Sequence, residues 1–261
     1  MTAHLSTVTV LAAFLVVSRT MAALLVLPDF GSAILPLRVR LALGLLLGVI
    51  LWSYADVSRV VAPPTLPQLV GLVANESVIG ILLGMSIGMA FHAVRFAGQL
   101  MGYQMGFALG SVLDPVSQEQ VPFLGQLLFL VAILLYLALD GHHMGIRALA
   151  ASFQTAPVGA SIVTPAAFDH FFRLTSGIFT TAILVASPVI ATLLLITVAL
   201  GLAARLLPQM QIFFVAYPLK IGAGLWMIAV SMPFFSHLMQ RLFHQAGLDV
   251  ERLLLRISAG V

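Results

Sequence analysis

Long apolar stretches dominate the chain and alternate with short polar connections. No stretch keeps the apolar–polar alternation of a half-buried strand, and most apolar stretches approach the roughly 20 residues that cross a bilayer as a helix. The pattern therefore predicts an all-α protein with about six to seven helical segments. The apolar runs cover residues 5–27, 37–55, 69–91, 96–113, 121–139, 172–203 and 210–236.

The stretch from residue 69 to 113 is too long for one ordinary crossing. It contains no proline, and a continuous helix over it would measure about 67 Å, about twice the hydrocarbon thickness. We expect a break near His92–Arg95, where polar side chains interrupt the run. Proline-containing loops are expected at 56–68, 114–120 and 155–170. Pro188 and Pro218 should kink or break the last two helices, because proline leaves a carbonyl free.

Composition places these helices in a membrane. Hydrophobic residues make up 61% of the chain and charged residues only 8%, with a mean hydropathy of +1.11. The chain has no cysteine, which excludes disulfides and thiolate metal sites. Basic residues form no cluster, so nucleic acid is not expected as a partner. Arg241, Arg252 and Arg256 place the C-terminal tail in the cytoplasm by the positive-inside rule.

Glycines recur at every fourth position in two neighbouring segments. The first ladder is Gly80, Gly84 and Gly88, and the second is Gly98, Gly102, Gly106 and Gly110. Such ladders let helix backbones approach closely, and ordinary packing within the chain or between copies explains them by itself. The alternative is a compact, adjustable wall around a conduit. Methionine pairs at i,i+4 within the same segments fit a flexible seal, but methionine is also common core filler.

Candidate catalytic chemistry is sparse. The string Gly84–Gly88 matches G-x-S-x-G, but that nucleophile motif needs a strained strand-to-helix turn and here lies in an apolar helix. His142 and His143 follow Asp140, yet two neighbouring histidines in a loop cannot close a coordination sphere, so no metal site is predicted. No cofactor and no enzymatic activity are expected, because no convergent set of nucleophile, base and metal ligands is present.

Ionisable residues inside apolar helices are expensive in lipid and face protein or water. The chain has four such residues: Arg19, Glu76, Arg95 and Arg205. His92 lies about one helical turn from Arg95. Glu76 is the only carboxylate in its run. It is interpreted either as the partner of an arginine that fixes helix contacts or as a proton site.

The chain resembles the FliR family, the export-gate component of flagellar type III secretion, whose injectisome relatives are called SctT. Five stretches carry the likeness in order along nearly the whole chain. They are "SRTMAALLVLPDFGSAILPLRVRLAL" (18–43), "ESVIGILLG" (76–84), "AGQLMGYQMGFALGSVLDPVSQEQVPFL" (97–124), "LALDGHHMGIRALAASFQTAPVG" (137–159) and "RLLPQMQIFFVAYPLKIGAGL" (205–225). The Asp-Gly-His-His form of the fourth stretch is more typical of the flagellar members.

The resemblance implies an assembly in the bacterial inner membrane, within the flagellar basal body. One copy would join about five FliP-like and about four FliQ-like subunits. Together they would form a pore for unfolded exported proteins, surrounded by membrane lipid. FlhB-like and FlhA-like proteins are further expected partners. Residues 1–159 resemble the pentameric subunit, and residues 160–261, which include a short cytoplasmic tail, resemble the small hairpin subunit. Tilted hairpins are expected to pack into the gate.

The resemblance also assigns residues. The family's plug, which blocks the closed pore, matches Met105, Gly106, Phe107, Leu109, Gly110, Ser111, Val112, Leu113, Asp114 and Pro115. Helix packing and subunit contacts are expected at Gly80, Gly84, Gly88, Gly98, Gly102, Glu76, Arg95, Arg205, Pro208, Gln209, Pro218 and Lys220. The alternative from another class is a small-solute transporter or channel acting alone, which predicts inverted repeats and a polar site at the midplane.

Overall fold

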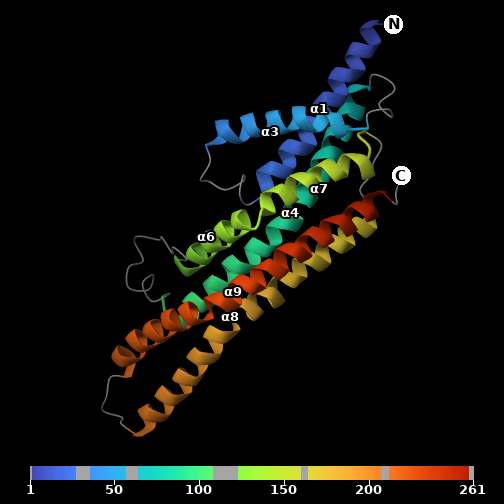
Figure 1. Ribbon diagram of the computed structural model, residues 1–261. Helices are drawn as coiled ribbons and strands as arrows, with labels where there is room; N and C mark the ends of the chain where they lie inside the picture. Colours follow the sequence, from blue (N-terminus) through green and yellow to red (C-terminus); the bar gives the residue numbers. More distant parts are fainter. Residues whose placement is uncertain are drawn as a thin grey trace. The chain divides into compact units, whose positions relative to one another are not determined.

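The structure is a computed structural model that describes residues 2–27, 36–56, 64–107, 123–159, 164–206 and 212–258. These residues form seven α-helices and one short 3-10 helix, η1 (Trp52–Tyr54), and contain no strand, which confirms the predicted all-α class. The α-helices are α1 (Thr2–Val26), α3 (Leu37–Leu51), α4 (Leu66–Met105), α6 (Phe123–Ala138), α7 (Gly141–Thr155), α8 (Pro165–Leu206) and α9 (Ile212–Ser258) (Figure 1).

Several helices are long and apolar enough to cross a membrane. Within the described residues there are five such spans, or six if α6 and α7 count as one broken span. The five are Val8–Val26, Leu37–Tyr54, Leu66–Met105, Pro165–Leu206 and Phe214–Ile257. The last three are 40, 42 and 44 residues long. Each is therefore about twice as long as the roughly 20 residues needed for one crossing.

The first of two compact units comprises Met1–Ala90, Tyr136–Ser176 and Leu242–Val261. It contains α1, α3 and α7, together with the start of α4 and α8 and the end of α9. A Cβ atom at Gly48 would lie 2.9 Å from Cγ2 of Val17, so α3 lies against α1 at this glycine. The rings of Tyr136 and Phe243 pack edge to face, with centroids 5.1 Å apart.

The second compact unit comprises Phe91–Leu135 and Gly177–Arg241. It contains the C-terminal part of α4, most of α6, and the adjoining parts of α8 and α9. Two edge-to-face aromatic pairs connect its helices. Phe91 of α4 packs against Phe129 of α6, and Phe96 of α4 packs against Phe179 of α8. Within each unit α8 and α9 run antiparallel and side by side (Figure 1); in the second unit, Val185 of α8 and Ile228 of α9 line one small cavity.

The expected break at His92–Arg95 is wrong. Helix α4 is continuous from Leu66 to Met105 and passes through these residues without interruption. The polar side chain of Arg95 is accommodated by a partner rather than by a turn: it donates a hydrogen bond of 2.7 Å to Oε1 of Gln126 and lies over the ring of Phe129. Because no proline interrupts residues 69–105, nothing in the backbone ends the helix there.

The prolines do not break the last two helices either. Helix α8 passes through Pro188, and α9 passes through Pro218 and Pro233. At Pro188 the missing N–H leaves the carbonyl of Leu184 without its usual helical donor, and the Ser187 hydroxyl donates to that oxygen at 2.8 Å. The side chain therefore replaces the backbone bond that proline removes.

The segment expected as a loop at 155–170 is shorter than predicted. Helix α7 ends at Thr155 and α8 already begins at Pro165, a position where proline is well tolerated because the first helical N–H groups have no partner. The histidine pair is also placed differently, since His142 and His143 belong to the first turn of α7 and not to a loop.

Candidate functional site

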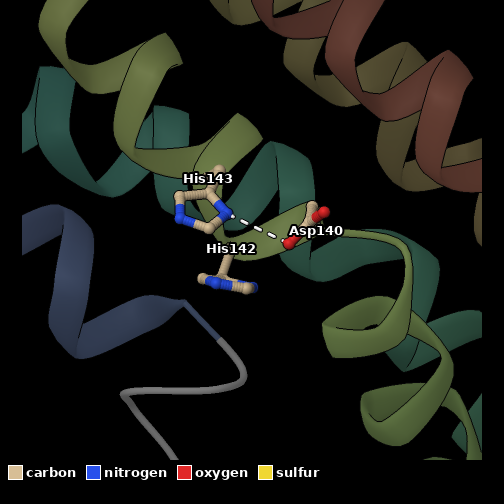
Figure 2. Close-up of side chains that lie close together, drawn as sticks. All are labelled: Asp140, His142 and His143. Atoms are coloured by element: carbon tan, nitrogen blue, oxygen red, sulfur yellow. Dashed lines mark hydrogen bonds and ion pairs between the residues drawn. The ribbon is translucent and has the colours of Figure 1, made fainter.

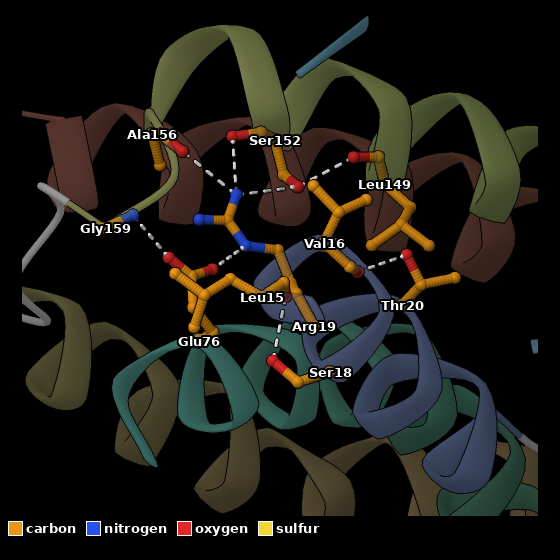
Figure 3. Close-up of polar contacts among 10 residues, drawn as sticks. All are labelled: Leu15, Val16, Ser18, Arg19, Thr20, Glu76, Leu149, Ser152, Ala156 and Gly159. Carbon is orange, nitrogen blue, oxygen red and sulfur yellow. Dashed lines mark hydrogen bonds and ion pairs between the residues drawn. The ribbon is translucent and has the colours of Figure 1, made fainter. Parts of the chain in front are cut away.

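Three of the sequence stretches that carry the family resemblance meet in one buried polar network of the first unit. The stretches are those around Arg19 in α1, around Glu76 in α4, and from Ser152 to Gly159 at the end of α7 (Figure 3). The side chains of Arg19 and Glu76 are both completely buried, and Arg19 Nε donates to Glu76 Oε2 at 2.6 Å. The structure thus pairs Glu76 with an arginine, which was one of its two interpretations.

Arg19 also binds the C-terminal end of α7. Its Nη1 atom donates to the carbonyl oxygens of Ser152 and Ala156, each at 3.0 Å. A helix C-terminus carries partial negative charge on its last carbonyl groups, so a guanidinium at this position stabilises it. The guanidinium lies over the ring of Phe153, 4.7 Å from the centroid, which adds a cation–π contact.

Glu76 holds the turn that follows α7. Its second carboxylate oxygen, Oε1, accepts a hydrogen bond of 2.9 Å from the backbone N–H of Gly159. Gly159 has a φ of +78°, in the left-handed region that favours glycine. The Pro-x-Gly end of this signature is therefore explained by a turn whose N–H must face the buried carboxylate.

The network fixes an arrangement more than it adds stability. Removing two charges from water is expensive, and the ion pair repays this only when further hydrogen bonds satisfy its remaining groups. Here Ser152, Ala156 and Gly159 supply such bonds, although Nη2 of Arg19 is buried without a hydrogen-bond partner among the described residues. Because these donors and acceptors lie on α7 and its following turn, these bonds require α1, α4 and α7 to pack together as they do here.

The first glycine ladder brings α4 onto α1 directly beside this network. A Cβ atom at Gly80 would overlap the carbonyl oxygen of Arg19, and one at Gly84 would lie 2.6 Å from the carbonyl oxygen of Ala23. Gly88 is buried one turn further along. Within the chain, this ladder therefore serves close packing of two helix backbones.

The second ladder is used differently along its length. A Cβ atom at Gly98 would lie 2.6 Å from Cα of Gly125, so α4 and α6 touch backbone to backbone at this point. At Gly102 the nearest atom to such a Cβ is Cδ1 of Leu124, at 3.9 Å, which is ordinary contact. Gly102 is half-buried and, as far as the described parts of the chain go, has room for a side chain.

The C-terminus of α4 is closed by a Schellman motif. The N–H of Phe107 donates to the carbonyl of Gly102, the N–H of Gly106 donates to that of Tyr103, and Gly106 has a φ of +93°. A Cβ atom at Gly106 would lie 2.7 Å from the ring of Tyr217 in α9. The preceding residue, Met105, is completely buried, and Phe107 is 42% exposed.

The buried Met105 side chain fills the space beside Gly224 of α9. A Cβ atom at Gly224 would lie 2.8 Å from Cγ of Met105. The end of α4 is therefore seated on α9 at two points within the second unit, one at Met105 and one at Gly106. The rest of the sequence-assigned plug, from Leu109 to Pro115, lies outside the described residues.

The remaining predicted contact residues are not brought together. Arg205 is exposed near the end of α8, and Pro218 is exposed in α9. Lys220 is half-buried in α9, while Pro208 and Gln209 lie outside the described residues. These positions stay predictions.

The sequence predicts several site residues but not the residues that they contact. Gly125, Tyr217 and Gly224 received no role, although each lies against a predicted site residue. The only local signal is that Gly125 and Gly224 lie within otherwise apolar helical runs, where a glycine lowers helix stability by about 1 kcal/mol and so often has a packing reason.

Comparison with known proteins gives the class. The model of bacterial export proteins, family 1, matches residues 10–246, and the chain belongs to this family. The flagellar biosynthetic protein FliR of Pectobacterium carotovorum subsp. carotovorum is 33% identical over 87% of this chain and 86% of its own length. FliR of Escherichia coli (strain K12) is 31% identical over the same shares, and FliR of Bacillus subtilis (strain 168) is 31% identical over 84% and 85%.

Proposed function

We propose that the chain is a single-copy, non-enzymatic subunit of the flagellar type III export gate in the bacterial inner membrane. In this proposal it joins about five FliP-like and four FliQ-like subunits and contributes to the pore through which unfolded proteins leave the cell. The observation that carries the proposal is the convergence of three family signature stretches on the Arg19–Glu76 network. The likeness to FliR over 87% of the chain supports the same assignment.

The exposed faces of α8 and α9 support a role within an assembly. In the most apolar part of α4, 72% of the residues are buried within the chain, but the corresponding shares are 22% for α8 and 6% for α9. Large apolar side chains such as Leu195, Phe214 and Trp226 are more than three-fifths exposed. Surfaces of this kind need lipid or partner helices to cover them.

Gly102 is the position in the second ladder that is available for contact between subunits. Unlike at Gly98, a Cβ added at Gly102 meets no backbone among the described residues, so a larger side chain should leave the isolated fold intact. We expect Gly102→Leu to abolish co-purification with the FliP-like partner. Gly71→Leu is the matched control and should leave co-purification unchanged. Gly71 lies on the same helix, and no atom of the described residues would lie within 4 Å of an added Cβ. Normal assembly of Gly102→Leu would count against this contact.

The plug assignment begins at the end of α4. We propose that the segment after Gly106 blocks the closed pore and is displaced when substrate passes, with the Schellman motif as its fixed end. Deleting residues 107–113 should raise the ion conductance of the purified assembly in planar bilayers. Unchanged conductance of a correctly assembled complex would show that this segment is not the plug.

The proposed export role has a direct genetic test. Deleting the gene in its native flagellated cell should stop export of flagellar subunits, and the wild-type chain supplied in trans should restore it. Continued export of the same subunits without this chain would overturn the proposal.

A further inference from the structure

The turn between α6 and α7 places two imidazoles and a carboxylate beside one another. Asp140, His142 and His143 each offer a ligand atom, and the three atoms all lie within 4.8 Å of one another (Figure 2). His143 Nδ1 lies 3.3 Å from Asp140 Oδ1, and the two imidazole ring centroids are 4.1 Å apart. The sequence shows that the three residues lie within four positions; the structure shows that their ligand atoms lie close together.

Local backbone geometry explains why the carboxylate is available. Asp140 precedes the first residue of α7, where an aspartate ordinarily accepts a hydrogen bond from the N–H groups of the first turn. Here it takes a φ of 55° and its side chain makes no capping hydrogen bond. The carboxylate faces His143 instead, and it is 78% exposed.

His142 supplies a second, separate observation. Its Nδ1 atom is buried and meets no hydrogen-bond partner among the described residues. In neutral imidazole one ring nitrogen carries a proton and the other a lone pair that can accept a proton or a metal ion. A buried ring nitrogen without a partner is energetically unfavourable, and no hydrogen bond to a described residue competes for this atom.

We propose that Asp140, His142 and His143 form a binding site for a divalent transition-metal ion of the zinc type. Two imidazole nitrogens and one carboxylate oxygen match the donor preference of Zn²⁺, with water completing the coordination. Mg²⁺ and Ca²⁺ prefer sites built from oxygen atoms and fit this donor set poorly. The site is independent of the proposed export role.

One pair of candidate ligand atoms already has the spacing that Zn²⁺ requires. Ligand atoms around a tetrahedral Zn²⁺ at a distance of about 2.1 Å lie about 3.4 Å from one another. The 3.3 Å separation of His143 Nδ1 and Asp140 Oδ1 already meets this spacing. The other separations reach up to 4.8 Å, so binding requires the side chains of the cluster to change their rotamers.

Bound metal would tie the turn to the start of α7. Asp140 lies before the helix, whereas His142 and His143 lie in its first turn, so one ion would cross-link the two. The opposite end of α7 is held by Arg19 through the carbonyls of Ser152 and Ala156. The metal site would therefore fix the end of this helix that the buried network does not reach.

Metal titration of the purified full-length chain tests the proposal. The chain carries a tag without histidine, is treated with a chelator, and is titrated in detergent with Zn²⁺ by calorimetry and with Co²⁺ by visible absorption. We expect one equivalent to bind, with a tetrahedral Co²⁺ spectrum, and millimolar Mg²⁺ not to compete. Asp140→Asn and His143→Ala should each weaken Zn²⁺ binding by about 10-fold or more.

Histidines elsewhere provide the matched control. His237 and His244 are exposed on α9 and belong to no such cluster among the described residues, so His237→Ala and His244→Ala should bind Zn²⁺ like the wild type. Size-exclusion profiles and circular dichroism check that each variant is folded. Asp140→Asn is the conservative variant that keeps the site's shape if His143→Ala fails to fold. Absence of saturable Zn²⁺ binding to the folded wild type, or equal losses in the control variants, would overturn the proposal.

Discussion

Replacing Glu76 with alanine should destabilise the protein severely, because it leaves the Arg19 guanidinium buried without its counter-ion. Both side chains are completely buried, and their Nε–Oε2 distance of 2.6 Å makes this a direct, charge-assisted bond. The substitution also removes the acceptor of the Gly159 N–H. Two favourable contacts disappear at once, and no solvent reaches the site to replace them.

The size of the effect follows from this burial. Removing one partner of a buried ion pair lowers the free energy of unfolding by about 3–5 kcal/mol. For a chain of this size, each kcal/mol corresponds to about 2–4 °C, so the midpoint of thermal unfolding should fall by about 6–20 °C. Asp249→Ala is the matched control: it removes the Arg252–Asp249 ion pair, whose side chains are 63% and 21% exposed, and should change the free energy by less than about 1 kcal/mol.

Circular dichroism of the purified chain in lipid nanodiscs, followed during heating, measures these midpoints. The double variant Arg19→Met, Glu76→Leu provides a second readout, since removing both charges together should restore most of the stability that Glu76→Ala loses. A Glu76→Ala midpoint equal to that of Asp249→Ala would refute the reasoning. So would a double variant whose loss equals the sum of the losses of Arg19→Met and Glu76→Leu, each measured alone.

Two further predictions use the glycines of α4. Gly98→Ala should lower the unfolding midpoint, because the new Cβ would lie 2.6 Å from Cα of Gly125. At Gly71 no atom of the described residues would lie within 4 Å of a new Cβ, so Gly71→Ala should leave the free energy of unfolding unchanged or raise it by up to about 1 kcal/mol. Equal effects at both positions would contradict close backbone packing. Gly106→Ala should destabilise by about 1–2 kcal/mol from its φ of +93° alone, and by more through Tyr217. Tyr217→Ala should relieve the second part in a double-mutant cycle; additive losses would exclude the contact.

The helices were predictable because their signal is local. A run of apolar residues near the length of a bilayer crossing predicts a helix whatever it packs against. The same reasoning failed at His92–Arg95, since a hydropathy pattern registers the polar side chain of Arg95 but not its partner. That partner, Gln126, lies 31 residues later in another helix. A polar residue that ends a helix and a polar residue that has a partner in another helix look the same in the sequence.

The site was predictable only as separate residues. Arg19 and Glu76 stand out because a charge inside an apolar helix is expensive, but 57 residues separate them and nothing in either run identifies the other as its partner. The carboxylate beside His143 was missed for a different reason. Its position depends on the left-handed backbone of Asp140, and a non-glycine residue with positive φ has no reliable sequence signal.

The measurement that tests the central proposal most directly is native mass spectrometry of the tagged chain, extracted from its native flagellated cell in mild detergent. We predict a complex that contains one copy of this chain, five FliP-like subunits and about four FliQ-like subunits. A monomer or homodimer that survives gentle extraction without other membrane subunits would contradict the export-gate account and favour a transporter or channel that acts alone.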